Sequence, residues 1–412
     1  MSRMSVRTLL VTAKRHLQQA IKEKGIASFV IGNESADLDS ITCAVLYAYI
    51  QSNTVQSRRT NKVAIPVTNI PASDLPLRPE LTALLKHADI KPSDLITLDD
   101  LGKLPLPLSK AEWTLVDHNK LQSALGEHYA SSITGVIDHH DDENAVPKSA
   151  EPRILEKSGS CNSLVANYCR PAWDDFASAS SFVGAALGQS SDGVVDDAAY
   201  TSTWDAQLAK LSLASILIDT YNLTDESKVT DYDRKAVKYL EARINSSPKI
   251  GKSYDRQAFF DEINTAKSDL DDLSLEDILR KDYKQWNEGS FTLGISSVVK
   301  PIEYLKTKHS HFVKTVASFA SERRLSLFAI MTAYTDESGK FARQLYLQCL
   351  DKNAEHVFDR FIEGAGTELQ LNKSEMQLGD GGDDVHESNL WNQKNVAASR
   401  KSVGPLLREA MR

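Results

Sequence analysis

Several features that would define other classes of protein are missing from this sequence. Its four cysteines, Cys43, Cys161, Cys169 and Cys349, show no CxxC spacing, which is typical of a reduced intracellular chain without structural zinc. No apolar run reaches about 18 residues, so we expect no membrane-spanning helix. The chain has 48 basic and 56 acidic residues, which gives it a net charge of −8. Any phosphate must therefore be bound by a local cluster of cations rather than by the overall field.

Common motifs of phosphate-handling and hydrolytic enzymes are also absent. The sequence contains no GxxxxGK[ST] loop, no HExxH and no GxSxG elbow. No segment pairs basic with aromatic residues in the way that a nucleic-acid platform does, so we expect no nucleic-acid partner. A water activated by bound metal is the nucleophile that these absences leave.

What remains is an ordinary globular composition, with 41% hydrophobic and 25% charged residues in 412. A chain of this length predicts two domains. Residues 1–22 carry basic but no acidic side chains, which is one feature of a mitochondrial presequence. We favour an amphipathic first helix instead, because Leu10, Ala13, Leu17 and Ile21 recur at helical spacing.

Short β-prone runs alternate with helical patterns in the first half of the chain. The predicted strands are 28–32, 63–67, 95–98, 113–116 and 134–137, and a helix is predicted over 40–50. This alternation predicts an α/β domain with a mostly parallel sheet flanked by helices. An apolar stretch, 207–219, is followed by a polar segment, and we predict domains at 1–224 and 236–412 joined by a linker at 225–235. In the second domain we expect charged helices over 233–286, strands at 291–300, 325–333 and 343–348, and a final helix at 402–412.

Acids and histidines stand at the ends of the runs in the first domain. In an open α/β sheet, the carboxyl ends of the strands are where ligands bind. Carboxylates beside imidazoles predict a site for Mn²⁺, Mg²⁺ or Co²⁺, and a bridging carboxylate can hold two ions about 3.5–4 Å apart. The alternative is that such acids are helix caps or solvated loop residues. The residues concerned are Asp37, Asp39, Asp117, Asp138, His139, His140 and Asp219.

A second group of candidates is cationic and lies in the other half of the chain. Lys284 stands in a charged segment, and Arg400 and Lys401 follow Ser399 just before the final helix. Arg binds phosphate through paired hydrogen bonds and Lys binds it as a point charge. Taken alone these are ordinary surface cations, and they gain meaning only if they face the metal site.

The motifs taken together resemble the DHH phosphoesterase superfamily, and within it the subfamily whose second domain is a DHHA2 domain. The chain is most similar to the fungal cytosolic exopolyphosphatases. The resemblance extends over nearly the whole chain, in ordered motifs that include Gly32-Asn-Glu-Ser-Ala-Asp-Leu-Asp-Ser40, Asp138-His-His140, Ser158-Gly-Ser-Cys-Asn-Ser163, Ile216-Leu-Ile-Asp-Thr220 and Ser399-Arg-Lys401. It implies a smaller α/β DHHA2 domain at the C-terminus and an active site in the cleft between the two domains.

The resemblance also implies a role for each candidate residue. Two divalent cations, Mg²⁺ or Mn²⁺ with Co²⁺ as a further choice, would occupy the site. Asp138 would orient its neighbouring histidines, since a ligating imidazole usually donates its other nitrogen to an acceptor. Substrate would be bound by His140, Lys284, Arg400 and Lys401. The metal ligands would be Asp37 for the first ion, Asp39, His139 and Asp219 for the second, and Asp117 as the bridge.

One position departs from a related family. The family II inorganic pyrophosphatases carry His four residues before the first Asp of their Asp-x-Asp pair, where this chain has Asn33. Replacing imidazole by an amide should favour Mg²⁺ over Mn²⁺, and it argues against pyrophosphate as the main substrate. Asn33 is then a weak metal ligand or a contact of bound water or phosphate, and we group it with Asp117 and His140 as catalytic.

The function that the resemblance implies is hydrolysis of terminal phosphate from inorganic polyphosphate by a water that two metals activate. The alternative enzyme is a related phosphohydrolase acting on pyrophosphate, short-chain polyphosphate or nucleotides. A binding or scaffolding protein on the same fold is the alternative of another class, and the complete ligand set argues against it. We expect a monomeric cytoplasmic protein with no membrane partner, and a minor mitochondrial pool remains open.

Overall fold

The computed structural model describes residues 4–186, 191–379 and 385–412, without the side chains from 179 to 199. The chain divides into two compact units, Met1–Ala266 and Lys267–Arg412. The division therefore lies beyond 225–235, where we had predicted the linker. The reason is that α9 (Asp231–Asn245) packs against α7 (Cys161–Ala186) and α8 (Ser191–Asp219) of the first unit.

A six-stranded sheet forms the centre of the first unit, and its strands pair in the order β3-β2-β1-β4-β5-β6. All of its pairings are parallel. Phe29 of β1 is in register with Trp113 of β4, and their rings stack with centroids 4.3 Å apart. The strands are β1 (Ile26–Ile31), β2 (Ala64–Thr68), β3 (Ile96–Thr97), β4 (Lys110–Val116), β5 (Ile133–Asp138) and β6 (Arg153–Leu155). Strand order reverses between β1 and β4, which makes this the point where ligands bind in such sheets.

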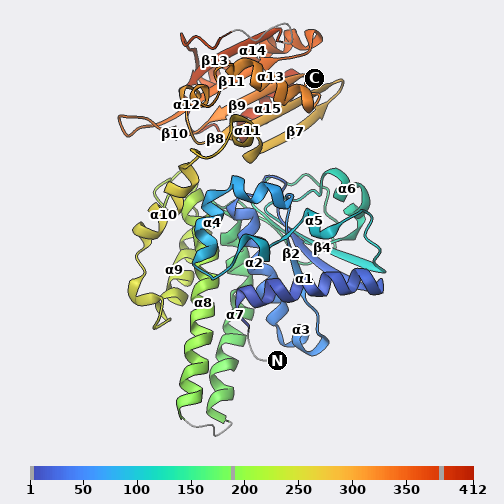
Figure 1. Ribbon diagram of the computed structural model, residues 1–412, viewed down its shortest axis with the longest axis vertical. Helices are drawn as coiled ribbons and strands as arrows, with labels where there is room; N and C mark the ends of the chain where they lie inside the picture. Colours follow the sequence, from blue (N-terminus) through green and yellow to red (C-terminus); the bar gives the residue numbers. More distant parts are fainter. Residues whose placement is uncertain (1–3, 187–190, 380–384) are drawn as a thin grey trace. The chain divides into compact units, whose positions relative to one another are not determined.

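Helices cover both faces of this sheet (Figure 1). On one face, α2 (Leu38–Asn53), α7, α8 and α9 share one apolar core, and α7 and α8 run side by side as a long pair. On the other face lie α5 (Leu98–Leu101), α6 (Ser123–Tyr129) and the second half of α1. The predicted first helix is confirmed as α1 (Val6–Glu23), whose Leu10, Ala13 and Leu17 are fully buried. The remaining helices of this unit are α3 (Val55–Thr60), α4 (Pro79–Lys86) and α10 (Arg256–Ser268).

The second unit contains a mixed seven-stranded sheet with the order β12-β13-β11-β9-β8-β7, and β10 pairs with β11. Only β8 and β9 are parallel among the pairs described. Its strands are β7 (Tyr283–Glu288), β8 (Phe291–Val298), β9 (Leu327–Thr332), β10 (Tyr334–Thr335), β11 (Phe341–Cys349), β12 (Leu371–Lys373) and β13 (Glu387–Gln393). One face packs against α14 (Glu355–Leu369) and α15 (Arg400–Ala410). The other packs against α11 (Leu275–Lys281), α12 (Ile302–Lys308) and α13 (Phe312–Glu322).

The predicted α/β architecture is confirmed, and each predicted strand overlaps an observed one. The prediction of helices over 233–286 was wrong at its end, because residues from Tyr283 onward form β7. This strand lies at the edge of the sheet, and edge strands carry charged residues much as exposed helices do.

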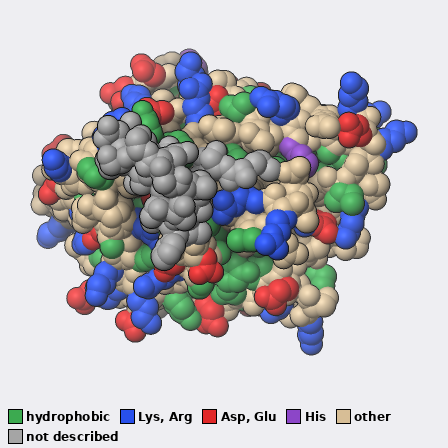
Figure 2. Space-filling model, turned by 90° about the horizontal axis from the view of Figure 1, so that it is seen from below, with side chains coloured by type: hydrophobic (Ala, Val, Ile, Leu, Met, Phe, Trp, Pro, Cys, Tyr) green, Lys and Arg blue, Asp and Glu red, His purple; other side chains and the backbone are tan. Residues whose placement is uncertain are grey.

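The hydropathy of the helices and the distribution of charge on the surface agree with what the sequence predicts. Within the described residues, no helix combines the length and hydropathy needed to cross a membrane. On the face shown in Figure 2, cationic and anionic side chains are interspersed over the described residues.

Candidate metal centre

Three loops that follow neighbouring strands bring predicted ligands together. The loop after β1 carries Asn33 and Asp37, Asp117 directly follows β4, and His139 and His140 directly follow β5. Because these strands are parallel neighbours, their carboxyl ends meet at one edge of the sheet. Since β1 and β4 flank the reversal of strand order, Asp117 lies where the topology predicts a bound ligand.

The loop after β1 is tight because Gly32 has no side chain. A Cβ atom at Gly32 would lie 2.5 Å from the Cβ atom of Ser40, so another residue would force α2 away from the strand. Asp37 caps α2, since its side chain accepts the backbone N–H of Ser40 at 3.0 Å. These two contacts fix the path of the loop into the helix.

Arg78 holds the same loop through its carbonyl groups. The side chain is buried, with Nε donating to the carbonyl of Ala36 at 2.7 Å and Nη2 to that of Ser35 at 2.5 Å. Nη1 donates to the carbonyl of Asp74 at 3.0 Å. Ala36 has a φ of 42°, a backbone conformation that L residues rarely adopt and that surrounding contacts must maintain. Arg78 therefore positions the loop that carries Asn33.

Asp117 is the acceptor on which this loop converges. Its Oδ2 accepts hydrogen bonds from Asn33 Nδ2 at 2.8 Å and from Ser40 Oγ at 2.7 Å. The Oδ1 atom of Asn33 accepts the backbone N–H of Ser35 at 2.9 Å, which leaves the amide nitrogen facing Asp117. Asp117 has a φ of 60°, and strained backbone of this kind is concentrated at functional sites. Asn33 thus donates a hydrogen bond to the central carboxylate.

The surroundings of Asp117 raise its pKa. Burial is the largest cause and the negative charges of Asp39 and Asp37 add to it, while the hydrogen bond with His139 acts in the opposite direction. Together they raise the pKa of Asp117 to about 7. The Nε2 atom of His139 lies 3.3 Å from Oδ1 of Asp117. A divalent cation between these atoms would offset the repulsion among the carboxylates.

Asp138 orients the two histidines that follow it. Its Oδ1 accepts the backbone N–H of His139 at 2.8 Å and Nδ1 of His140 at 2.7 Å, and its Oδ2 accepts Nδ2 of Asn119 at 2.6 Å. Burial opposes ionisation, but the hydrogen bonds and the charge of His140 outweigh it and hold the pKa of Asp138 well below its usual range. The predicted orienting contact is therefore found for the ring of His140, whereas the ring of His139 faces the carbonyl of Ser158.

The hydrogen bonds at Nδ1 determine what each histidine presents to the site. Nδ1 of His139 faces the carbonyl of Ser158 at 3.0 Å, and Nδ1 of His140 faces the carboxylate of Asp138. Both partners are acceptors, so Nδ1 carries a proton in each ring, and the neutral form of each ring then has its lone pair on Nε2. The rings meet edge to face with centroids 4.7 Å apart. Each ring therefore offers Nε2 to a cation or to a proton.

The carboxylate of Asp39 contacts the first turn of α7. It accepts the backbone N–H groups of Cys161 at 2.7 Å and Asn162 at 3.0 Å, and the hydroxyl of Ser160 at 2.7 Å. The positive end of a helix dipole stabilises a carboxylate in this position. Asp39 therefore anchors α7, while its charge acts on Asp117.

A further buried carboxylate, Asp233 of α9, holds the segment before α7. It accepts the backbone N–H groups of Gly159 at 2.9 Å and Ser160 at 3.2 Å. It also accepts the backbone N–H of Thr230 at 2.7 Å and its hydroxyl at 2.8 Å. Asp233 therefore ties the first turn of α9 to the segment that supplies partners for His139 and Asp39.

Asp219 ends α8 and is half-buried. A Cβ atom at Gly159 would lie 2.5 Å from Cγ2 of Thr220, the residue after Asp219. The neighbouring Ser158 accepts the hydrogen bond from His139. These contacts bring the end of α8 to the side of the site on which His139 lies, where Asp219 is predicted to bind the second ion.

Four side chains form a compact group of possible metal ligands. One ligand atom from each of Asp117, Asp138, His139 and His140 lies within 4.8 Å of the others. Carboxylate oxygens and imidazole nitrogens together suit Mn²⁺, Mg²⁺ or Co²⁺. Because Asp117 is buried and is repelled by Asp39 and Asp37, a cation would stabilise it in the charged form. The residues at this edge of the sheet therefore fit a divalent cation.

Two buried thiols lie beside this group. Sγ of Cys43 is 3.5 Å from Oδ1 of Asp39, and burial raises the pKa of Cys161 to about 12 and the pKa of Cys43 well above its usual value. The thiolate is the form that binds metals, so these thiols pack as small apolar groups. All four cysteines of the chain are unpaired and buried.

Comparisons with known proteins agree with this arrangement. The model of the DHH family N-terminal domain matches residues 28–186, and the model of the DHHA2 domain matches residues 261–410. A Schizosaccharomyces pombe protein named "Putative exopolyphosphatase" is 35% identical over 410 residues, which is 100% of this chain and 96% of the relative. The chain belongs to the DHH family. The resemblance predicted from the motifs is confirmed, and the DHHA2 match nearly coincides with the second unit.

More distantly similar proteins also match most of the chain. Human "Exopolyphosphatase PRUNE1" is 26% identical over 95% of this chain and 77% of its own length. The "Manganese-dependent inorganic pyrophosphatase" of Methanothrix thermoacetophila is 22% identical over 74% of this chain and 80% of its own length. The crystal structure of a Methanococcus jannaschii "putative family II inorganic pyrophosphatase" has the same fold, with a TM-score of 0.55 at 19% identity over 93% of this chain and 99% of that one.

In the DHHA2 domain, the predicted phosphate-binding cations are neighbours. Arg400, the first residue of α15, donates from Nη1 to the carbonyl of Asp282 at 2.9 Å and from Nη2 to its carboxylate at 2.7 Å. Lys284 follows on β7, and Lys401 is the next residue of α15. The three cations thus gather where β7 and α15 begin.

The residues that position the DHH ligands are the ones that sequence reasoning missed. Arg78 belongs to no recognised chemical motif, and Ser40 was noted only as the last residue of the motif at 32–40. Asp233 stands three residues after Thr230, a capping-box spacing that marks the start of a helix but not a link to a metal centre. The motif at 158–163 was noted only as part of the resemblance, and the structure shows it supplying partners to His139 and Asp39.

Proposed function

We propose that this DHH-family protein is a divalent-cation-dependent exopolyphosphatase, which removes terminal orthophosphate from inorganic polyphosphate. The observation that carries the proposal is the ligand group around Asp117 and His139, found in a chain 35% identical to the S. pombe relative along its length. Divalent cations bound there polarise phosphoryl oxygens and lower the pKa of water.

We assign the ligands as a two-cation set in which Asp117 is the bridge. Its central position is supported by the hydrogen bonds that converge on Oδ2, which leave Oδ1 directed at His139. Asp37 and Asp39 lie close enough for their charges to act on Asp117. We assign Asp37 to the first cation, and Asp39, His139 and Asp219 to the second.

His140 is proposed to hydrogen-bond the reacting phosphate and to move a proton. Asp138 accepts from its Nδ1 and so directs Nε2 away from the sheet's buried carboxylate. The same carboxylate stabilises the imidazolium form, as an orienting aspartate does in other enzymes that use histidine as an acid and base. A protonated Nε2 can then donate to a phosphoryl oxygen or to the departing phosphate.

Asn33 is proposed to set the preference for cation and substrate. Its amide N–H faces Asp117, and an N–H group cannot bind a cation. The site then depends more on oxygen ligands, which favours Mg²⁺ over Mn²⁺. For the same reason we propose that polyphosphate, rather than pyrophosphate, is the main substrate.

The cations of the DHHA2 domain are proposed to bind the phosphates next to the reacting one. Arg400 is held by both the carbonyl and the carboxylate of Asp282, which fixes its guanidinium before substrate binds. Lys284 and Lys401 add two charges nearby. We further propose a cytoplasmic location, because four unpaired thiols are typical of a reducing compartment.

The test is phosphate release from long-chain polyphosphate with Mg²⁺, beside pyrophosphate and a nucleoside triphosphate at equal concentration. We expect fast cation-dependent release from the polymer and slow release from pyrophosphate, and loss of nearly all turnover in an Asp117→Asn variant. Faster turnover of pyrophosphate or the nucleotide would move the assignment to the related phosphohydrolases. No hydrolysis with any cation would overturn the enzymatic assignment.

A further inference from the structure

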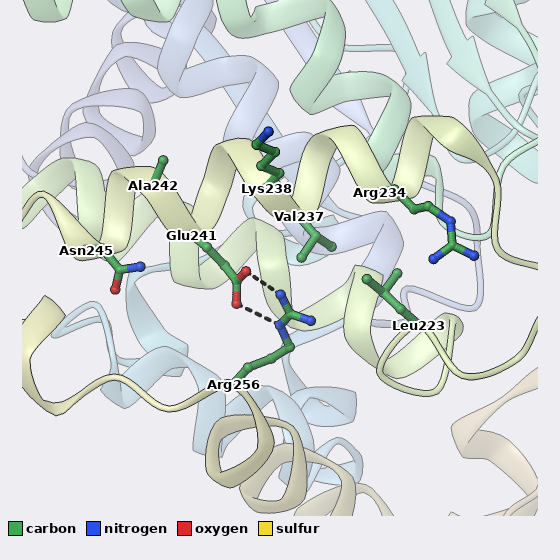
Figure 3. Close-up of a pocket in the computed structure, with 8 residues that line it drawn as sticks. All are labelled: Leu223, Arg234, Val237, Lys238, Glu241, Ala242, Asn245 and Arg256. Carbon is green, nitrogen blue, oxygen red and sulfur yellow. Dashed lines mark hydrogen bonds and ion pairs between the residues drawn. The ribbon is translucent and has the colours of Figure 1, made fainter.

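A cavity of about 480 Å³ lies along α9 in the first unit (Figure 3). Its walls come from α9, from the loop after α8 and from the start of α10. The residues that line it include Leu223, Arg234, Lys238, Glu241, Asn245 and Arg256. We refer to this cavity as the α9 groove.

Cations outnumber acids in the lining of the α9 groove. Arg234 and Lys238 stand four residues apart, a spacing that places them on one side of a helix. Both are exposed, and neither forms an ion pair with any residue that the structure describes. With Arg256 they make three positive charges against the single carboxylate of Glu241. This excess is local, because the chain as a whole carries a net charge of −8.

Arg256 is held rigidly in the middle of the groove. Its Nε donates to Oε1 of Glu241 at 2.7 Å, and its Nη2 donates to Oε2 of the same carboxylate. The hydroxyl of Tyr254 also donates to Glu241, at 2.9 Å. The remaining nitrogen, Nη1, points toward the end of the groove lined by Leu223 and Arg234 (Figure 3). A guanidinium fixed along one edge by a carboxylate presents the N–H groups of Nη1 to an anion at little entropic cost.

One end of the groove adjoins the framework of the metal centre. Leu223 lies four residues after Asp219, in the loop that follows α8. Arg234 directly follows Asp233, whose carboxylate holds the segment that accepts the hydrogen bond of His139. The groove therefore begins at residues that follow Asp219 and Asp233 in the chain, and it continues along α9.

We propose that the α9 groove binds phosphate groups of a polyphosphate chain whose terminal phosphate lies at the metal centre. This proposal rests on the proposed function. Every phosphate of the chain carries negative charge, so a long chain gains affinity wherever cations line its path. Arg234 and Lys238 would bind successive phosphates as the chain passes, and Arg256 would bind one through Nη1. On this proposal, a triphosphate bound at the metal centre does not reach the groove.

The test compares chain lengths in a variant that carries Arg234→Gln and Lys238→Gln. We expect KM for long-chain polyphosphate to rise about fivefold, which corresponds to about 1 kcal/mol for the two charges together, because an exposed charge pair contributes at most about 1 kcal/mol. We expect kcat for the long chain, and both constants for tripolyphosphate, to stay at wild-type values. An unchanged KM for the long chain would overturn the proposal.

A matched control removes the same charge elsewhere. Arg58→Gln with Arg59→Gln alters α3, which follows the end of α2 opposite to the metal centre. An equal rise of KM for long-chain polyphosphate in this control would show that overall charge is responsible, and it would overturn the proposal that the groove binds polyphosphate.

Binding of fluorescently labelled long-chain polyphosphate, measured in an Asp117→Asn background with Mg²⁺, separates the two proposals. Weaker binding when Arg234→Gln and Lys238→Gln are added supports binding in the groove, even if the wild-type protein hydrolyses no polyphosphate. Unchanged binding overturns the proposal that the groove binds polyphosphate, while the exopolyphosphatase assignment stands.

Discussion

Replacing Asp117 by Asn is expected to stabilise the cation-free protein while it abolishes activity. Burial and the charges of Asp39 and Asp37 raise the pKa of this carboxyl from 3.8 to about 7. Each pKa unit corresponds to about 1.36 kcal/mol, so ionising Asp117 above pH 7 costs the folded protein up to about 4 kcal/mol. An amide at this position has no charge to bury.

The hydrogen bonds at position 117 also suit an amide. Its oxygen can replace Oδ2 and accept from Asn33 and Ser40, which both donate to that atom. Its nitrogen can replace Oδ1, which lies 3.3 Å from Nε2 of His139, and it can donate to that nitrogen when the imidazole is neutral. The variant therefore leaves these buried polar groups satisfied.

The sign of the pH dependence follows from the pKa values. The folded-state pKa of Asp117 lies above the unfolded value, so the folded protein binds more protons between about pH 4 and pH 7. The contribution of this group to stability is fully present below pH 4 and is lost as the pH rises through 7. Denaturant unfolding in EDTA at pH 5 and pH 8 measures it. Asp117→Asn should exceed the wild type in stability at pH 8, and by less at pH 5.

Asp138→Asn is the matched variant with the opposite expectation. Both oxygens of Asp138 accept from N–H donors of His139, His140 and Asn119, so an amide would turn a donor toward a donor. Because hydrogen bonds to charged groups contribute about 1.5–3 kcal/mol each, we expect a loss of roughly 2–4 kcal/mol at pH 8. If Asp117→Asn lost as much stability as Asp138→Asn in EDTA, the account of Asp117 as a buried, repelled carboxylate would be refuted.

Asn33→His is expected to raise Mn²⁺-supported kcat/KM relative to Mg²⁺-supported kcat/KM by about tenfold, because an imidazole nitrogen suits the softer ion; an unchanged ratio would contradict the role given to Asn33. Arg78→Met should weaken Mg²⁺ binding about tenfold in calorimetry, a size typical of outer-sphere positioning groups, while circular dichroism shows an intact fold. Asp233→Asn should lower both the melting temperature and the Mg²⁺ affinity. Thr230→Ala leaves the bonds to Gly159 and Ser160 in place and should lower only the melting temperature, and equal affinities in these two variants would exclude a positioning role for Asp233.

The strands and the residues at their ends were predictable because their signals are local. Asp117 and Asp138 each come directly after a short apolar run, and parallel strands bring their carboxyl ends to one edge whatever the intervening sequence does. The family motifs added the roles, since neither the identity of a ligand nor the count of cations follows from periodicity.

The positioning groups were not predictable because their contacts are distant in sequence. Arg78 reaches carbonyls more than 40 residues away, and Asp39 binds the first turn of a helix more than 120 residues away. The sequence around Arg78 does not distinguish a buried Arg from an exposed one. The boundary between the units was misplaced for a similar reason, because the polar segment at 225–235 is compatible with either a linker or a loop within one unit.

Because Gly32 packs closely on Ser40, the residue at position 33 can be replaced during evolution without a change in the residues around it. Because the loop cannot move away from α2, its path is the same whichever side chain stands next to Gly32. A mutation at Asn33 therefore changes the chemistry presented to the cation while the carboxylates keep their places. Codons for Asn and His differ by a single base, so if Asn33 has the proposed role, enzymes with different metal requirements would be one nucleotide apart on this scaffold, with no change in the core or the sheet.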